Sequence, residues 1–202
     1  FPDGTWKAFR RPTLGTPARQ LAALLQEAAI PDHEEVRVGI AGIGKEIFDN
    51  GMRRHFVSDV AATAAGVRRL NPDVSMIFDM GGEYSRVITL HPDGSVADFA
   101  MNGQCAAGAG AFLEQQAGRL QMDVAELSRL ALQAPRAAVI AGRCSVFAKS
   151  DMIHLQQKGT PVEEMAYGLC LALVRTFVSS VLAGREPRAP LAVVGGGAHN
   201  GG

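Results

Sequence analysis

Apolar residues along this chain alternate between helix-like and strand-like spacing. Recurrence every three to four residues predicts helices over 17–29, 58–70, 108–120, 124–133 and 161–182, and one more that begins near Cys144. Dense runs rich in β-branched residues predict strands over 36–43, 74–80, 84–90, 95–101 and 191–194, with a turn at 91–94. Three consecutive strands followed by alternating helices and a last strand predict an α/β fold, a mixed sheet with helices on its faces.

The composition leaves this picture unchanged but excludes some classes of function. The chain has 202 residues, 47% of them apolar, and its 20 basic and 20 acidic residues give a formal net charge of zero. A neutral chain offers no electrostatic support for a nucleic-acid partner. The longest uninterrupted apolar runs, such as 169–174, fall short of a bilayer span, and the polar, turn-rich first residues do not resemble a secretory signal. We therefore expect a cytoplasmic protein with neither a nucleic-acid nor a membrane partner.

Two glycine-rich segments follow predicted strands. Asp79-Met80-Gly81-Gly82 ends the strand 74–80, and Gly195-Gly196-Gly197 follows the strand 191–194. Glycines at a strand end let backbone amides approach a phosphate closely, and a carboxylate there can order a metal-bound water. Taken alone, each segment is better explained as a plain turn or a flexible loop. Together and in this order, the two segments support each other as a nucleotide site.

The three cysteines lie in different settings. Cys105 and Cys144 occur in Gly/Ala-rich turns just before predicted helices, whereas Cys170 lies within the apolar stripe of the helix 161–182 and is expected to be a core residue. A thiolate at a helix N-terminus is stabilised by the positive end of the helix dipole. Two thiolates do not complete an ordinary iron–sulfur site, which needs four, although a two-fold dimer would supply the other two. From spacing alone, two small buried residues remain the stronger interpretation.

Four segments resemble one known family. They are the two cysteine segments, NGQCAAGAGAFLEQQAGRL and AGRCSVFAKSDMIHLQQKG, together with IFDMGGEYSRVI and VVGGGAHNGG. All four are similar to segments of the CoA-substrate-specific enzyme activases, the ATPase activators of 2-hydroxyacyl-CoA dehydratases, which are related to ATPase subunits of benzoyl-CoA reductase. The resemblance extends from about Val36 to Asn200, and the separation of the two cysteines agrees with it. It therefore favours the cysteines as ligands over the interpretation from spacing alone.

The resemblance implies an α/β, actin/sugar-kinase/chaperone-like (ribonuclease H-like) two-lobe ATPase fold with mixed sheets and helices on their faces. Residues 1–73 would form part of the first lobe, and 74–202 the second lobe with the phosphate, cysteine and adenosine motifs. It implies ATP or ADP with Mg²⁺, and a homodimer whose one [4Fe–4S] cluster is held by Cys105 and Cys144 of each chain. Asp79 would be the catalytic residue. The other expected site residues are Gly81, Gly82, Glu83, Ser85, Gly108, Gly110, Gly195, Gly196 and Gly197.

By the same resemblance, the activity would be ATP-dependent transfer of one low-potential electron. The acceptor would be a CoA-substrate dehydratase or reductase, and the donor a ferredoxin or a flavodoxin. Two other functions stay open: a kinase-type phosphotransferase on the same fold, which would need neither cysteine, and a nucleotide-binding regulatory module without turnover.

The chain departs from the family pattern in three places. The family's first phosphate motif, an Asp-x-Gly-Ser loop, would precede Phe1, and because both ends look cut we expect a fragment of a longer, fused protein. Glu83-Tyr84 stands where the family usually has Gln-Asp, and Lys149 stands where it usually has an acid. These departures predict weak nucleotide binding and weak hydrolysis.

Overall fold

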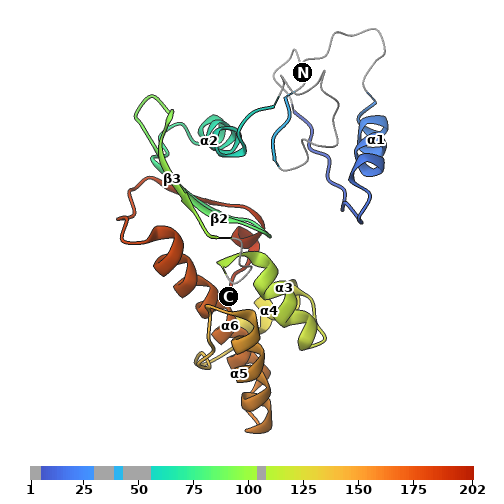
Figure 1. Cartoon of the computed structure of the whole chain (residues 1–202), viewed down its shortest axis with the longest axis vertical. Coiled ribbons are helices and arrows are strands. Elements are labelled where there is room, and N and C mark those ends of the chain that lie inside the picture. Colours follow the sequence, from blue (N-terminus) through green and yellow to red (C-terminus); the bar gives the residue numbers. More distant parts are fainter. Residues whose placement is uncertain (1–5, 30–38, 43–55, 104–107) are drawn as a thin grey trace. The chain divides into compact units, whose positions relative to one another are not determined.

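The chain forms two compact units, Phe1–Ala62 and Thr63–Gly202 (Figure 1). The computed structural model describes residues 6–29, 39–42, 56–103 and 108–202. In the first unit, α1 (Pro17–Ala28) confirms the helix predicted over 17–29. Pro17 occupies the first helical position, where a backbone N–H would have no partner within the helix, so proline is tolerated there. Ile40 forms an isolated parallel bridge with Phe56. Half of the strand predicted over 36–43 lies outside the described residues, and the predicted lobe boundary at residue 73 stays a prediction.

The second unit is built on a four-stranded sheet with the strand order β3-β2-β1-β4. Its strands are β1 (Met76–Met80), β2 (Ser85–Leu90), β3 (Val96–Met101) and β4 (Leu191–Val194). β1 pairs antiparallel with β2 and parallel with β4, which confirms the mixed sheet. Parallel pairing places the carboxyl ends of β1 and β4 at the same edge of the sheet. The two glycine-rich segments that follow these strands therefore lie together, although the chain between them is long.

The helices fall close to their predicted ranges. They are α2 (Asp59–Leu70), which crosses the boundary between the units, α3 (Gly110–Arg119), α4 (Val124–Ala131), α5 (Ser145–Gln157) and α6 (Val162–Thr176). Local signals mark several of their ends: Asp123 caps α4, because its side chain accepts a hydrogen bond of 2.8 Å from the backbone N–H of Glu126. The short apolar segment 137–140, part of the structurally described chain, forms no strand.

The helix predicted over 161–182 changes character before its end. After Thr176 the chain continues as the π-helix η4 (Phe177–Leu182). The hydroxyl of Thr176 donates to the backbone oxygen of Ala172 at 3.0 Å, a side-chain bond of the kind that bends helices. Residues 162–182 are long and apolar enough to cross a membrane by length and composition, but 61% of their most apolar window is buried, as in a core helix. Polar residues interrupt this stretch, so its uninterrupted apolar runs are shorter than a bilayer span.

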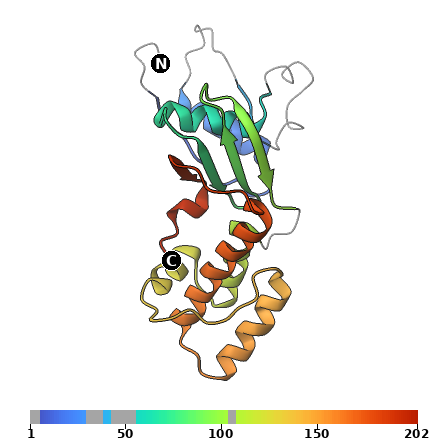
Figure 2. The same ribbon diagram turned by 90° about the vertical axis from the view of Figure 1, so that its left-hand side faces the viewer.

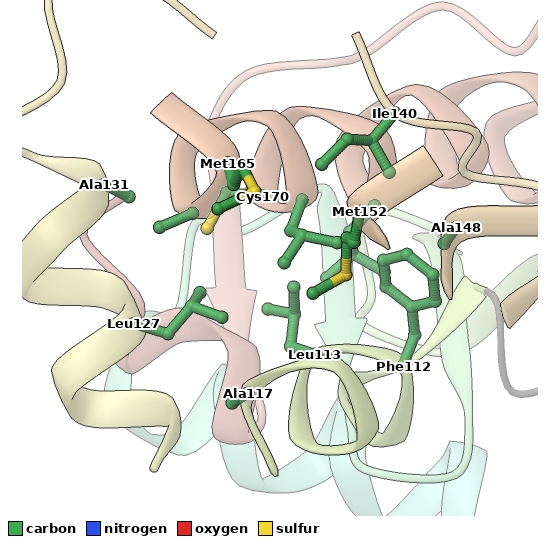
Figure 3. Close-up of a cluster of buried hydrophobic side chains, with 13 residues drawn as sticks. Phe112, Leu113, Ala117, Leu127, Ala131, Ile140, Ala148, Met152, Met165 and Cys170 are labelled. Carbon is green, nitrogen blue, oxygen red and sulfur yellow. The ribbon is translucent and has the colours of Figure 1, made fainter. Parts of the chain in front are cut away.

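Among its described residues, the second unit has two clusters of buried side chains that stabilise it. The larger lies among α3, α4, α5 and α6, where Phe112, Leu113 and Met152 lie together (Figure 3). The smaller joins the sheet to η4, and the ring centroids of Phe78 and Phe177 are 5.1 Å apart in it. Figures 1 and 2 show α6 and η4 running from the helical part of this unit to its sheet. One long helical segment thus fixes the helices relative to the strand ends.

Candidate functional site

The two glycine segments lie against each other at the edge where β1 and β4 end. Gly195 has φ +88°, and a Cβ there would lie 2.6 Å from the backbone oxygen of Met80 and 2.9 Å from Oδ1 of Asp79. A Cβ on Gly197 would lie 2.7 Å from Cβ of Met80, whereas Gly196 faces open space. Close approach of β1 therefore requires glycine at 195 and 197, and Gly196 leaves its backbone accessible to a ligand.

The Gly81–Gly82 turn is joined to the start of α3. Gly81 closes the turn by donating to the backbone oxygen of Tyr84 at 2.8 Å. Its own backbone oxygen accepts from Gly110 N at 2.9 Å, and that of Gly82 accepts from Ala111 N at 2.8 Å. A Cβ on Gly110 would lie 3.1 Å from the Gly81 oxygen, so glycine permits this docking. Gly82, like Gly196, faces open space. The turn thus uses its carbonyl groups to hold α3 and leaves one residue open.

Asp79 lies at the end of β1 in a buried ion pair with Arg86. The hairpin register places the two residues directly opposite each other, and Arg86 Nε donates to Asp79 Oδ2 at 3.1 Å, with Nη2 on the same oxygen. Both side chains are about one-tenth exposed. The other carboxylate oxygen, Oδ1, lies on the side of Gly195. The sequence motif did not single out Arg86, although the register of a hairpin turning at Gly81-Gly82 could have found it.

Ser85 and Gly108 are brought together by a residue that the motifs did not single out, Asn102. Ser85 N donates to Asn102 Oδ1 at 2.7 Å, and Asn102 N donates to the Ser85 backbone oxygen at 3.0 Å. A Cβ on Gly108 would lie 3.2 Å from Asn102 Cβ, so glycine at 108 allows the backbone to approach the Asn102 side chain closely. The buried hydroxyl of Ser85 makes no hydrogen bond to any part of the chain that the structure describes. Glu83 is exposed.

A cavity of about 510 Å³ opens beside the glycine segments, a volume typical of small-molecule sites. Its lining comes from β1, α3, α4, α6, β4 and the last residues of the chain: Met80, Gly110, Leu113, Val124, Ala125, Ser128, Cys170, Leu173, Val174, Val193, Gly196, Gly197, Ala198, His199, Asn200 and Gly202. Most of these are apolar or small, so the cavity suits a flat, largely apolar group held by a few polar contacts.

Polar contacts close one wall of the cavity. Gly201 N donates to Ser128 Oγ at 2.9 Å, Gly202 N donates to Asn200 Oδ1 at 2.9 Å, and Asn200 Nδ2 lies 3.6 Å from Cys170 Sγ. Cys170 is buried within the larger core cluster, which confirms its predicted core position (Figure 3). Burial raises the pKa of its thiol, a change that the hydrogen bond to Asn200 opposes. Its position on the cavity wall was not predicted.

Cys144 occupies the N-cap position of α5, which confirms the helix predicted to begin near it. The backbone N–H groups of Phe147 and then Val146 lower the pKa of its thiol, because they favour the thiolate, although the side chain forms no capping hydrogen bond. Cys144 is a free cysteine. Cys105 lies outside the described residues. Its role as a ligand stays a prediction, as does that of Cys144.

The segment after Cys144 is hydrogen-bonded to α3. Ser145 Oγ donates to Gln115 Oε1 at 2.9 Å, and Arg119 Nη1 donates to the Ser145 backbone oxygen at 3.3 Å. Arg119 Nη1 also donates to Gln116 Oε1 at 2.5 Å. α3 therefore contacts the Gly81–Gly82 turn through its first residues and the Cys144 segment through its later ones. Sequence motifs did not identify this arrangement.

Comparison with known proteins gives a consistent result. Residues 16–202 match the BadF/BadG/BcrA/BcrD ATPase family. The chain is 28% identical to the 2-hydroxyisocaproyl-CoA dehydratase activator of Clostridioides difficile, over 92% of this chain and 69% of that protein. It is 29% identical to the (R)-2-hydroxyglutaryl-CoA dehydratase activating ATPase of Acidaminococcus fermentans, over 76% of this chain and 58% of that protein. It is 30% identical to one of the subunits of the benzoyl-CoA reductase of Thauera aromatica, over 74% of this chain and 52% of that protein.

Two solved structures resemble the chain closely. The activator of the 2-hydroxyisocaproyl-CoA dehydratase from Clostridium difficile with bound ADPNP superposes with a TM-score of 0.82 at 26% identity, over 97% of this chain and 71% of that one. Component A of the Acidaminococcus fermentans (R)-2-hydroxyglutaryl-CoA dehydratase gives 0.80 at 26% identity, over 93% and 71%. The predicted actin/sugar-kinase/chaperone-like α/β fold and the resemblance to the activases are both confirmed.

Proposed function

We propose that this chain, which belongs to the BadF/BadG/BcrA/BcrD ATPase family, is an ATP-dependent activator that delivers low-potential electrons to a 2-hydroxyacyl-CoA dehydratase or a related reductase. The observation that carries the proposal is that α3 contacts both the Gly81–Gly82 turn and the segment of Cys144. A nucleotide site and a thiolate site are then linked by a single helix. The names of the relatives, which activate CoA dehydratases, support the class of partner.

The nucleotide would occupy the cavity beside β1 and β4. Its apolar walls suit an adenine ring, and the open backbone of Gly196 suits the sugar. The phosphates would lie at Gly82, where an added Cβ would also meet open space. Asp79 would hold a Mg²⁺-bound water through Oδ1, since Oδ2 is engaged by Arg86. The ADPNP bound to the Clostridium difficile activator supports nucleotide binding by this chain.

The residues around Cys144 fit an anionic iron–sulfur cluster. Cys144 is at a helix start, where backbone N–H groups stabilise its thiolate, and Cys105 would supply the second sulfur of each chain. Val146 and Phe147, each 64% exposed, leave an apolar surface next to Cys144 for the second subunit of a homodimer. A [4Fe–4S] cluster bound there would supply one-electron chemistry. The protein would work in the cytoplasm with a ferredoxin or a flavodoxin as donor.

A nucleotide-binding regulatory module without turnover is the second candidate. The buried pairing of Asp79 with Arg86 favours it, because a carboxylate already neutralised by a guanidinium holds a metal ion less well. Binding of ATP without hydrolysis would distinguish this module from an activator.

The test is purification of the protein without air, followed by iron analysis and electron paramagnetic resonance. We expect four iron atoms per dimer and a signal after reduction. Cys105→Ala and Cys144→Ala should each abolish both, whereas the matched control Cys170→Ala should retain them, because that thiol is buried in the core. A colourless, iron-free preparation, or a signal that survives loss of both predicted ligands, would refute the cluster assignment. Calorimetry with ADP and ATP tests the nucleotide site separately.

A further inference from the structure

We propose that Arg119 is a positioning residue that makes the start of α5, and hence Cys144, move as one body with α3. The role of this coupling in electron transfer rests on the proposed function, whereas the mechanical link between α3 and the Cys144 segment does not. Arg119 is the last residue of α3, and Nη1 contacts the Ser145 backbone oxygen, one residue after Cys144. Arg119 is therefore a charged side chain that joins the two helices next to the thiol.

The hydrogen bonds around Arg119 specify its position. Gln116, one turn earlier on α3, is fully buried, and its Oε1 accepts a hydrogen bond of 2.5 Å from Arg119 Nη1. The Nε2 of Gln116 has no partner among the residues that the structure describes. Reversing the amide would place two donors against each other. Gln116 thus leaves one buried donor unsatisfied while it holds the guanidinium, which makes this contact a specific feature of the site.

A second contact supports the first from the neighbouring residue. Ser145 Oγ donates to Gln115 Oε1 at 2.9 Å, so Ser145 is held to α3 through both its side chain and its backbone. On the other side, Ala141 N donates to Asp151 Oδ2 at 2.8 Å, which ties the chain before Cys144 to α5. The thiol therefore sits in a short segment that is anchored at both ends.

The opposite end of α3 is anchored to the Gly81–Gly82 turn. Gly110 N and Ala111 N donate to its two carbonyl groups at 2.9 and 2.8 Å. Between its ends α3 is packed by Phe112 and Leu113 into the larger core cluster (Figure 3). A helix of 10 residues held in this way transmits a displacement of the turn to the segment it contacts at its other end. Arg119 is the contact through which Cys144 would receive it.

The experiment is hydrogen–deuterium exchange of the first turn of α5 in nucleotide-free, cluster-free protein. Arg119→Ala should accelerate exchange of the Ala148 amide, which donates to the Cys144 backbone oxygen at 3.0 Å, about tenfold, since a charged hydrogen bond that holds this turn is lost. Arg119→Lys, which can still donate to the Ser145 carbonyl, should restore most of the protection. The matched control is Arg129→Ala, because Arg129 pairs with an exposed glutamate, Glu126, on its own helix, α4. Unchanged exchange in Arg119→Ala, or no rescue by lysine, would overturn the proposal.

A second measurement separates this inference from the proposed function. If the protein binds ADPNP, the ligand should alter exchange of the Ala148 amide in the parent, and Arg119→Ala should lose that response while its affinity for ADPNP stays the same. A response that persists in the variant would contradict the role of Arg119. If the parent does not bind ADPNP, the nucleotide part of the proposed function fails, and the nucleotide-free exchange still decides whether Arg119 positions the Cys144 segment.

Discussion

Replacing Gly195 by alanine tests whether the junction of β1 and β4 is as tight as the geometry implies. Gly195 has φ +88° and ψ 179°, a region that essentially only glycine adopts, and an alanine there costs about 1–3 kcal/mol. The new Cβ would also lie 2.6 Å from the backbone oxygen of Met80, in a strand that is paired on both sides and cannot move away easily. Overlap of this kind typically adds about 1–3 kcal/mol. We therefore expect the free energy of unfolding to fall by about 2–6 kcal/mol.

Gly196→Ala is the matched control, since a Cβ at the next residue meets open space. Its free energy of unfolding should change by less than about 1 kcal/mol. Urea denaturation followed by far-ultraviolet circular dichroism is the appropriate assay, because the one tryptophan, Trp6, lies in the first unit and does not report on the sheet. Equal urea midpoints for the two variants, at equal m-values, would refute the tight junction and with it the shared edge of the two glycine segments.

Three further predictions concern other parts of the second unit. Asp79→Asn should lower the free energy of unfolding by about 3–5 kcal/mol by removing the carboxylate charge opposite buried Arg86, and Asp79→Leu combined with Arg86→Met should recover much of it in urea denaturation. In the metal-free protein, the rate of Cys144 alkylation by iodoacetamide should rise with a midpoint pH below that of a free thiol, since the pKa of Cys144 is lowered. Peptide mass spectrometry measures this rate, and a midpoint at or above the free-thiol value would contradict the N-cap geometry. Gly168→Ala should destabilise the protein by about 1–3 kcal/mol, because the new Cβ would strike the backbone carbonyl of Ala138. Gly118→Ala, in open space on α3, should be neutral or slightly stabilising, and equal melting temperatures of the two variants would argue against close packing of Gly168 on Ala138.

Much of the secondary structure follows from local signals. The caps, glycines and prolines near the ends of α1, α4 and α5 stand beside the segments that they terminate, so the predicted ranges agree with the structure to within a few residues. The helix predicted over 161–182 does continue to Leu182. Its apolar spacing continues to Leu182, but the structure changes to a π-helix after Thr176, and spacing does not distinguish the two forms.

The candidate site depended more on tertiary contacts. The sequence pointed to Asp79 and to glycines on both sides of the site, because two glycine segments that each follow a strand support each other as a nucleotide site. It did not point to Arg86, Asn102 or Arg119. Arginine and asparagine are common surface residues, and only a folded chain shows which of them are hydrogen-bonded at a site.

The sequence by itself determined the elements, the two glycine segments, the cysteine at the start of a helix and the family, since each depends on neighbouring residues or on a motif of fixed spacing. The tertiary structure alone decided that β4 lies parallel to β1, which brings Gly195 to Met80, and that α3 joins the Gly81–Gly82 turn to the Cys144 segment. Such contacts form between residues far apart in the chain. They are selected by the packing of the whole core, because no local preference distinguishes one distant partner from another.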